Sequence, residues 1–219
     1  MSFDPTLIPK LFKDPRMFKS VEAWHDRGFE ILRDSNINLI VARHSSMRNC
    51  LFKKYLNNMD LTEQASRFKR RVEGAELLRS HINRHRLRHI IVPRKWLHEL
   101  PSIFSRGGQP SYILTVERLR IFDKEDSIDE YRNIERSLLH ELCPILATFK
   151  DLDFTARNAP FTSDGKIAFI DTEYVKLNND SRKDQRKRYM ECIERVLSGR
   201  RLREAEELWR EVSEKDYAQ

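Results

Sequence analysis

The residues best suited to chemistry are two carboxylates and an amide in the second half of the chain. Asp153 stands five residues before Asn158, and Asp171 follows thirteen residues after that asparagine. Between them, an Asp-Gly turn at residues 164–165 separates two apolar runs, which predicts a β-hairpin. Such a set suits phosphoryl transfer, because that reaction depends on positioning and on neutralising the charge of the phosphates.

This spacing resembles the catalytic loop and metal-binding strand pair of the protein-kinase-like superfamily. That superfamily includes an aminoglycoside-phosphotransferase-like branch and small bacterial effectors. The resemblance covers the order of elements from about Asn38 to Asp171. It implies that Asp153 is the catalytic acid that orients the acceptor hydroxyl, and that Asn158 and Asp171 hold Mg²⁺ on the phosphates of ATP.

The same resemblance assigns a lysine and a glutamate to the nucleotide phosphates. Lys53 resembles the strand lysine that pairs with the phosphates, and Lys54 is its competitor on the opposite face. Glu76 resembles the helix glutamate that holds this lysine, with Glu73 as the alternative. A Lys-Lys pair on an edge strand can also simply oppose aggregation, and Glu76 can be one more surface charge on its helix.

Two further segments are matched to nucleotide contacts. Ser45 and Ser46 lie in the polar turn of residues 44–49, where the resemblance implies a loop that covers the phosphates. Glu117 lies at the end of the predicted hinge strand, which lends backbone groups to adenine in such folds. The turn contains no glycine, so its backbone would approach a ligand less closely than a glycine-rich loop does.

The residues next to the acids depart from the family pattern. Asp151 and Leu152 replace the usual pair before the catalytic aspartate, and Asp151 competes with Asp153 as the active acid. Thr172 and Glu173 follow Asp171 where Phe-Gly is usual, and no recognisable activation segment comes after them. Because of these departures, the alternative to an active kinase is a pseudokinase, which binds its ligands or partners without catalysing phosphoryl transfer.

Hydrophobic periodicity predicts the elements that would position these residues. Strands are predicted over residues 38–43, 50–56, 89–93 and 111–117, and a hairpin over residues 159–171. Helices are predicted over residues 21–32, 62–84, 127–149, 181–197 and 201–214, with Pro144 interrupting the third and Gly199 capping the fourth.

This order predicts an α+β fold, a two-lobed protein-kinase-like domain. Its parts would be a helical extension (residues 1–36), a small lobe with an antiparallel sheet and one helix (37–117), and a reduced, mostly helical second lobe (118–219). The junction between the lobes is expected near residues 117–119. The length of 219 residues suits one such domain.

Composition narrows the class of partner. The net charge of +7 favours a polyanionic partner such as a nucleotide, a phosphoinositide, a nucleic acid or an acidic protein. The basic run of residues 182–188 can bind phosphates or can form the polar face of an amphipathic helix.

No apolar run is long enough to span a bilayer. The three cysteines lack paired spacing and read as reduced thiols, which predicts a cytoplasmic protein. Non-classical delivery into a host cell, as for bacterial effectors of this superfamily, is compatible with the sequence.

The sequence therefore predicts an ATP- and Mg²⁺-dependent phosphotransferase with an unidentified hydroxyl acceptor, either a protein or a small molecule. A pseudokinase that serves as a nucleotide- or protein-binding scaffold is the first alternative. A basic nucleic-acid-binding protein is the second, although aromatic residues do not alternate with the basic runs as a base-stacking surface requires.

Overall fold

The computed structural model of the chain describes residues 4–34, 39–56 and 60–215. It divides into two compact units. Unit 1 comprises residues 1–72 and 94–119, and unit 2 comprises residues 73–93 and 120–219. The fold mixes helices with an antiparallel sheet, which confirms the predicted α+β class.

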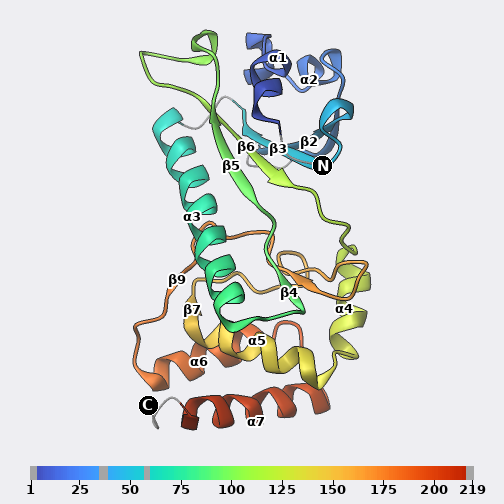
Figure 1. Ribbon diagram of the computed structural model, residues 1–219, viewed down its shortest axis with the longest axis vertical. Helices are drawn as coiled ribbons and strands as arrows, with labels where there is room; N and C mark the ends of the chain where they lie inside the picture. The colour runs from blue at the N-terminus through green and yellow to red at the C-terminus, as the bar shows by residue number, and fades with distance from the viewer. Residues whose placement is uncertain (1–3, 35–38, 57–59, 216–219) are drawn as a thin grey trace. The chain divides into compact units, whose positions relative to one another are not determined.

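Unit 1 is built on a five-stranded antiparallel sheet with the strand order β1-β2-β3-β6-β5 (Figure 1). Its strands are β1 (Phe29–Asp34), β2 (Leu39–His44), β3 (Cys50–Tyr55), β5 (Lys95–Glu99) and β6 (Tyr112–Glu117). The predicted hairpin of residues 38–43 and 50–56 is confirmed as β2 and β3, which pair Val41 with Lys53. Asn38, where that prediction began, lies outside the described residues.

The predicted helix of residues 21–32 is wrong, because this segment forms a short helix followed by a strand. A short helix, α2 (Glu22–Asp26), ends before Gly28, whose φ of 78° is a left-handed conformation that glycine adopts without strain. The chain then forms β1, so the sheet begins at Phe29 and not near residue 37. The other helical segments before β1 are η1 (Pro5–Leu7), α1 (Ile8–Leu11) and η2 (Pro15–Phe18).

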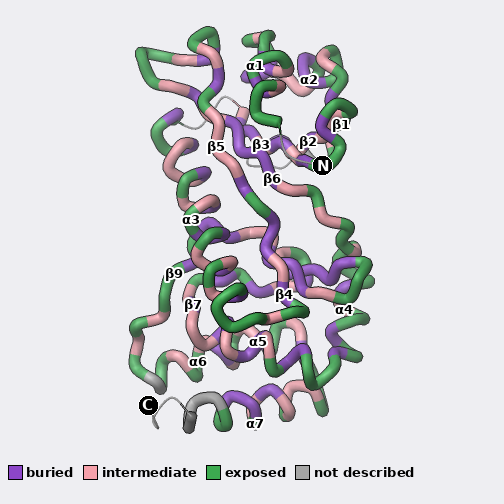
Figure 2. Tube along the Cα trace, in the orientation of Figure 1, coloured by how far each residue is buried: buried purple, intermediate pink, exposed green. Residues whose placement is uncertain are grey.

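The two faces of the sheet bury different side chains, because successive residues of a strand point to opposite faces. One face packs against the N-terminal helices, through an aromatic cluster in which the rings of Phe12 and Phe52 are 5.8 Å apart. The other face packs Tyr55 and Leu114 against Phe68 of helix α3 (Leu61–His85). Figure 2 shows the buried residues along β3 and β6 between these layers.

Helix α3 confirms the predicted helix of residues 62–84 and runs from unit 1 into unit 2. The remaining helices of unit 2 are α4 (Lys124–Arg132), α5 (Arg136–Thr148), α6 (Arg182–Ile193) and α7 (Gly199–Lys215). Its strands are short and form two pairs, which are β4 (Ile90–Ile91) with β8 (Ile167–Ala168) and β7 (Phe149–Lys150) with β9 (Lys176–Leu177). Short helical turns η3 (Ser45–Met47) and η4 (Ser102–Phe104) complete unit 1.

Two predictions about the later elements are wrong in detail, and one strand was missed. The helix expected over residues 127–149 is two helices, since α4 ends at Arg132 and α5 begins after Glu135, with Pro144 inside α5. Gly199 begins α7 and does not cap α6. Strand β5 was not predicted, because the charged and polar residues Lys95, His98 and Glu99 interrupt the run of strand-forming residues.

Candidate functional site

The loop that carries Asp153 is fixed by alternating apolar anchors. Leu152, Phe154 and Ala156 are buried, whereas Asp153 between them is exposed. Phe154 packs edge-on against Tyr131 of α4, with 5.6 Å between the ring centroids. The sequence therefore buries every second side chain of this loop and leaves the carboxylate of Asp153 in solvent.

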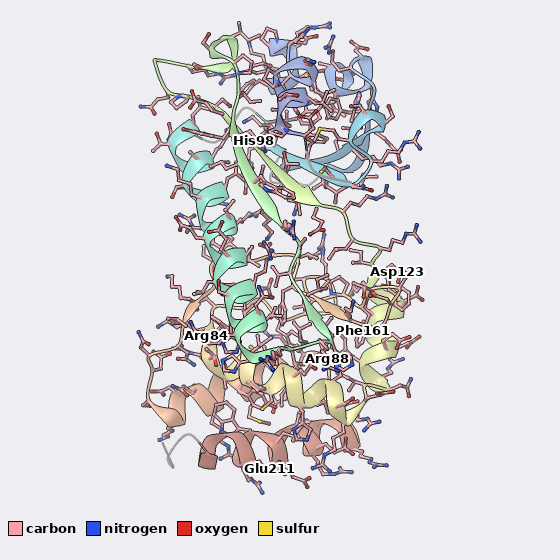
Figure 3. The ribbon with its side chains drawn as sticks, viewed as in Figure 1. Arg84, Arg88, His98, Asp123, Phe161 and Glu211 are labelled. Atoms are coloured by element: carbon pink, nitrogen blue, oxygen red, sulfur yellow. The ribbon has the colours of Figure 1, made fainter. Side chains whose placement is uncertain are left out.

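Tyr131 ties this loop to helix α4. Its hydroxyl is fully buried and donates a hydrogen bond of 2.6 Å to the carbonyl oxygen of Ala159. Burial raises the pKa of Tyr131 well above its usual value, so the hydroxyl stays a neutral donor. Its ring also contacts Phe161 in the hairpin, at 4.9 Å between centroids. Figure 3 labels Phe161 and also Asp123, whose carboxylate caps the start of α4.

The predicted hairpin between Asn158 and Asp171 is present, and its register brings the two residues together. The amide of Ile170 donates to the carbonyl oxygen of Asn158 at 2.9 Å, and Ala168 donates to Pro160 at 2.8 Å. At the tip, Gly165 adopts a φ of 78°. Asp171 therefore follows directly on the residue that is hydrogen-bonded to Asn158.

The second hairpin strand is supported from outside by β4. Ile90 pairs with Ile167 and Ile91 with Ala168 in a parallel arrangement, and Phe169 donates to the carbonyl oxygen of Ile91 at 3.0 Å. The predicted strand at residues 89–93 thus belongs to unit 2 and braces the hairpin.

Asn158 and Asp153 are also joined through their side chains. Nδ2 of Asn158 donates to Oδ2 of Asp153 at 2.5 Å, and Nη1 of Arg195 lies 3.6 Å from Oδ1 of the same carboxylate. Oδ1 of Asn158 accepts no hydrogen bond from any other residue that the structure describes. That oxygen is the atom an asparagine offers to a hard cation.

Asp151 is the competing acid of this loop. It is exposed and has a φ of 59°, a conformation that non-glycine residues adopt rarely. Within residues 60–215 it has no hydrogen bond to Asn158, whereas Asp153 has one. The geometry therefore favours Asp153 as the acid associated with the asparagine.

Gly74 lets the segment after Asp171 pack directly against helix α3. A Cβ atom at Gly74 would lie 2.1 Å from the carbonyl oxygen of Thr172, so the backbone of Thr172 lies directly against helix α3. Thr172 and Glu173 are buried, and Oδ1 of Asp171 accepts a hydrogen bond of 3.4 Å from the amide of Glu173. This contact fixes the residue next to Asp171.

Sequence reasoning missed Gly74 and Arg195. An isolated glycine inside a strong helical pattern is a signal for close packing, and it was present in residues 62–84. Arg195 lies between α6 and α7, and nothing in its sequence context indicates its proximity to Asp153.

Lys53 and Lys54 lie on opposite faces of β3. Lys53 shares the face of Tyr55, which packs on α3, and is half-buried. Lys54 is 2% exposed on the face of Phe52, where Nζ donates to Oε1 of Gln64 at 2.6 Å and lies 4.3 Å from the centre of the Phe18 ring. Burial, and then the charge of Arg106, lower the pKa of Lys54 to about 7.

Glu76 and Glu73 are both exposed on α3, in the part of the helix that belongs to unit 2. Their assignment as partners of Lys53 stays a prediction.

Ser45, Ser46 and Glu117 come together around one pocket of about 630 Å³ in unit 1. Lys53 does not line this pocket. The amide of Glu117 donates to the carbonyl oxygen of Arg94 at 2.8 Å, and the amide of Arg118 donates to that of Asn49 at 2.8 Å. The backbone amide of Glu117, which the resemblance assigns to the hinge strand, is therefore already hydrogen-bonded within unit 1.

The oxygen donors of unit 2 fit Mg²⁺. The described residues contain no group of three or more histidine, cysteine, aspartate or glutamate side chains that could hold a metal ion. Mg²⁺ does not need one, because it binds through one or two protein oxygens together with substrate phosphates and waters. The amide oxygen of Asn158 and the carboxylate of Asp171 are oxygen donors of the kind that Mg²⁺ takes, and they come from nearby positions of the hairpin backbone.

No protein-family model matches the chain, and no curated protein matches it in sequence.

Among the described residues, no helix combines the length and hydrophobicity needed to cross a membrane.

Proposed function

We propose that the chain is a phosphotransferase of kinase-like fold that uses ATP and Mg²⁺. The observation that carries the proposal is the hairpin register, in which Ile170 bonds to Asn158 while the side chain of Asn158 bonds to Asp153. The register places Asp171 directly after the residue that pairs with Asn158, and we infer that its carboxylate turns toward the same place. Phosphoryl transfer requires groups of this kind in one site.

Each residue has a role in this proposal. Asp153 accepts the proton of the acceptor hydroxyl, and its exposure leaves it accessible to an incoming substrate. Asn158 and Asp171 would hold the metal ion, which when bound neutralises charge on the phosphates. Lys53, from the α3 face of β3, would neutralise a phosphate oxygen, with Glu76 as its proposed partner. The acceptor carries a hydroxyl group and belongs to a protein or a small molecule.

The order of elements supports the kinase-like architecture. An antiparallel sheet is interrupted by one long helix, α3, and is followed by helices whose buried residues share a hydrophobic core with the hairpin of Asn158 and Asp171. The chain passes between the units after residues 72, 93 and 119, and the last of these passages lies next to the junction expected at residues 117–119. The two-lobed arrangement itself remains part of the proposal.

The test is ATP turnover by the full chain with Mg²⁺, measured as ADP release. Asp171→Ala should lower turnover by about 100-fold or more, because it removes a metal ligand used in the transition state. Asp164→Ala, at the exposed tip of the same hairpin, is the matched control and should leave turnover within about twofold. Full turnover in Asp171→Ala, or none in the unmodified chain, would refute the proposal.

A pseudokinase is the second candidate, and one observation favours it. The carboxylate of Asp153 is already engaged by Asn158 and by Arg195, which lies 3.6 Å away. A scaffold of this kind should bind nucleotide or a protein without turnover. Thermal unfolding with Mg-ATP distinguishes binding from its absence, since ligand at 100-fold over its Kd adds about 2.7 kcal/mol to the free energy of unfolding.

A further inference from the structure

Two adjoining cavities flank the turn between β2 and β3. The larger has a volume of about 630 Å³ and the smaller about 290 Å³, and Ser45 and Arg48 line both. All their lining residues belong to unit 1. Met47, which is buried in the aromatic cluster, anchors the turn between them.

These cavities lie on the face of the sheet opposite to Lys53. Cys50 alternates with Leu51 along β3 and packs in the cluster of the N-terminal helices. Glu117 shares that face with Ile113, whereas Lys53 shares the other face with Tyr55 and α3. The cavities are therefore separate from the position proposed for the phosphates of ATP.

The smaller cavity carries excess positive charge. Its single acid, Glu30, is paired with Arg43, with 2.5 Å between Nη2 and Oε2. Arg48 and Arg118 also line it, and neither has an acidic partner among the described residues. Two uncompensated guanidinium groups beside the hydroxyl of Ser45 form an environment that favours a phosphate group.

The larger cavity is balanced in charge and partly apolar. Arg48 and Arg94 face two acids, of which Asp4 accepts hydrogen bonds from Thr6 and Glu117 accepts one of 3.0 Å from the amide of Arg94. The hydrogen bonds from Thr6 lower the pKa of Asp4, so it remains charged. The other walls include Leu7, Met47 and Trp96, and the volume is in the range of small-molecule sites.

We propose that the two cavities together bind a small molecule that joins an aromatic or heterocyclic body to a phosphate, of which a nucleoside monophosphate is the simplest form. The phosphate lies between Arg48 and Arg118, and the uncharged body lies against Trp96 in the larger cavity. This site works independently of Asp153, Asn158 and Asp171, and it assigns Ser45 and Glu117 to a second ligand.

The test is calorimetric titration of the full chain with AMP, with adenosine and inorganic phosphate as separate probes of the two halves. Arg118→Glu and Arg48→Gln should each weaken AMP binding by about tenfold or more, because each removes a charged contact to the phosphate. Arg120→Glu, an exposed arginine that lines neither cavity, is the matched control and should leave the affinity unchanged. Asp171→Ala should also leave it unchanged.

Adenosine and inorganic phosphate should each bind more weakly than AMP, since each occupies only one cavity. No AMP binding at millimolar concentration overturns the proposal. So does AMP binding that Asp171→Ala abolishes and Arg118→Glu leaves intact, because that result assigns the nucleotide to the metal site. These outcomes therefore test the two-cavity site independently of the proposed phosphotransferase activity.

Discussion

Consecutive lysines on β3 have opposite environments. Lys53 is half-buried on the face that packs against α3, and Lys54 is enclosed between Phe18 and Gln64 on the other face. The sequence placed them on opposite faces of a strand through simple alternation. It did not indicate which face would be covered, because the cover comes from η2, far away in the chain.

The enclosure of Lys54 predicts a pH-dependent stability. The folded chain has lowered the pKa of Lys54 from 10.5 to about 7, so between these values the unfolded chain binds a proton that the folded chain does not. Stability therefore rises with pH through this window, by at most about 5 kcal/mol at 1.36 kcal/mol per pKa unit. Lys54→Met should flatten this slope, as measured by urea unfolding at pH 6, 8 and 10. The idea is wrong if the slopes of the two proteins coincide.

The buried hydroxyl of Tyr131 predicts a local effect on the site. Tyr131→Phe should lower the free energy of unfolding by about 1 kcal/mol, because the carbonyl oxygen of Ala159 loses its donor. It should also reduce ATP turnover, since that oxygen belongs to the residue after Asn158.

Tyr189 is the matched control for Tyr131. Its buried hydroxyl donates to the carbonyl oxygen of Ala205 in α7 at 2.8 Å, not to a residue of the Asp153 loop. Tyr189→Phe should cost similar stability in the same unfolding experiment and leave turnover unchanged. Equal turnover in both variants would show that the Tyr131 contact does not position the loop.

At the scale of elements, the position of the hairpin depends on helix α3. Gly74→Ala would favour a free helix by about 1 kcal/mol, but here the new Cβ atom meets the carbonyl oxygen of Thr172 at 2.1 Å. We expect a loss of stability of about 1–3 kcal/mol, together with lower ATP turnover. Ser80→Ala, at an exposed position of the same helix, should change neither. A Gly74→Ala protein with unchanged stability and turnover would contradict this role of the contact.

Elements were predictable where the pattern was local. The hairpin at residues 159–171, helix α3 and the strands β2, β3 and β6 follow from periodicity and from the Asp-Gly turn. The strand β1 was mistaken for a helix, because Val21, Trp24, Phe29 and Leu32 also fit a helical spacing. Only the left-handed Gly28 divides that run, and a sequence does not reveal a backbone angle.

The candidate site was predictable only in part, for a related reason. Asp153, Asn158 and Asp171 carry a spacing that can be read along one segment, whereas Gly74 and Arg195 reach the same region from distant segments. Ser45 and Ser46 were assigned from their place between two strands. The face of the sheet on which this turn lies is set by packing against the N-terminal helices. Such packing joins distant segments, so a local sequence pattern does not reveal it.

For the whole molecule, the net charge of +7 predicts weak, nonspecific binding to polyanions. Lys183, Arg186 and Lys187 are exposed on α6, while Tyr189 and Ile193 of the same helix are buried, as expected for a solvated helix face. Binding to single-stranded DNA should therefore weaken steeply with salt, by about tenfold or more between 50 and 200 mM NaCl in a fluorescence anisotropy titration. Tight binding that persists at 200 mM would instead favour a nucleic-acid-binding protein.

The central claim is that Asn158 and Asp171 share one divalent cation. Its most direct test is electron paramagnetic resonance of Mn²⁺, used in place of Mg²⁺, with the full chain and a non-hydrolysable ATP analogue. We predict one Mn²⁺ bound per chain, lost in Asp171→Ala, weakened in Asn158→Ala and retained in the Asp164→Ala control. Unchanged Mn²⁺ binding in both Asp171→Ala and Asn158→Ala would contradict the account.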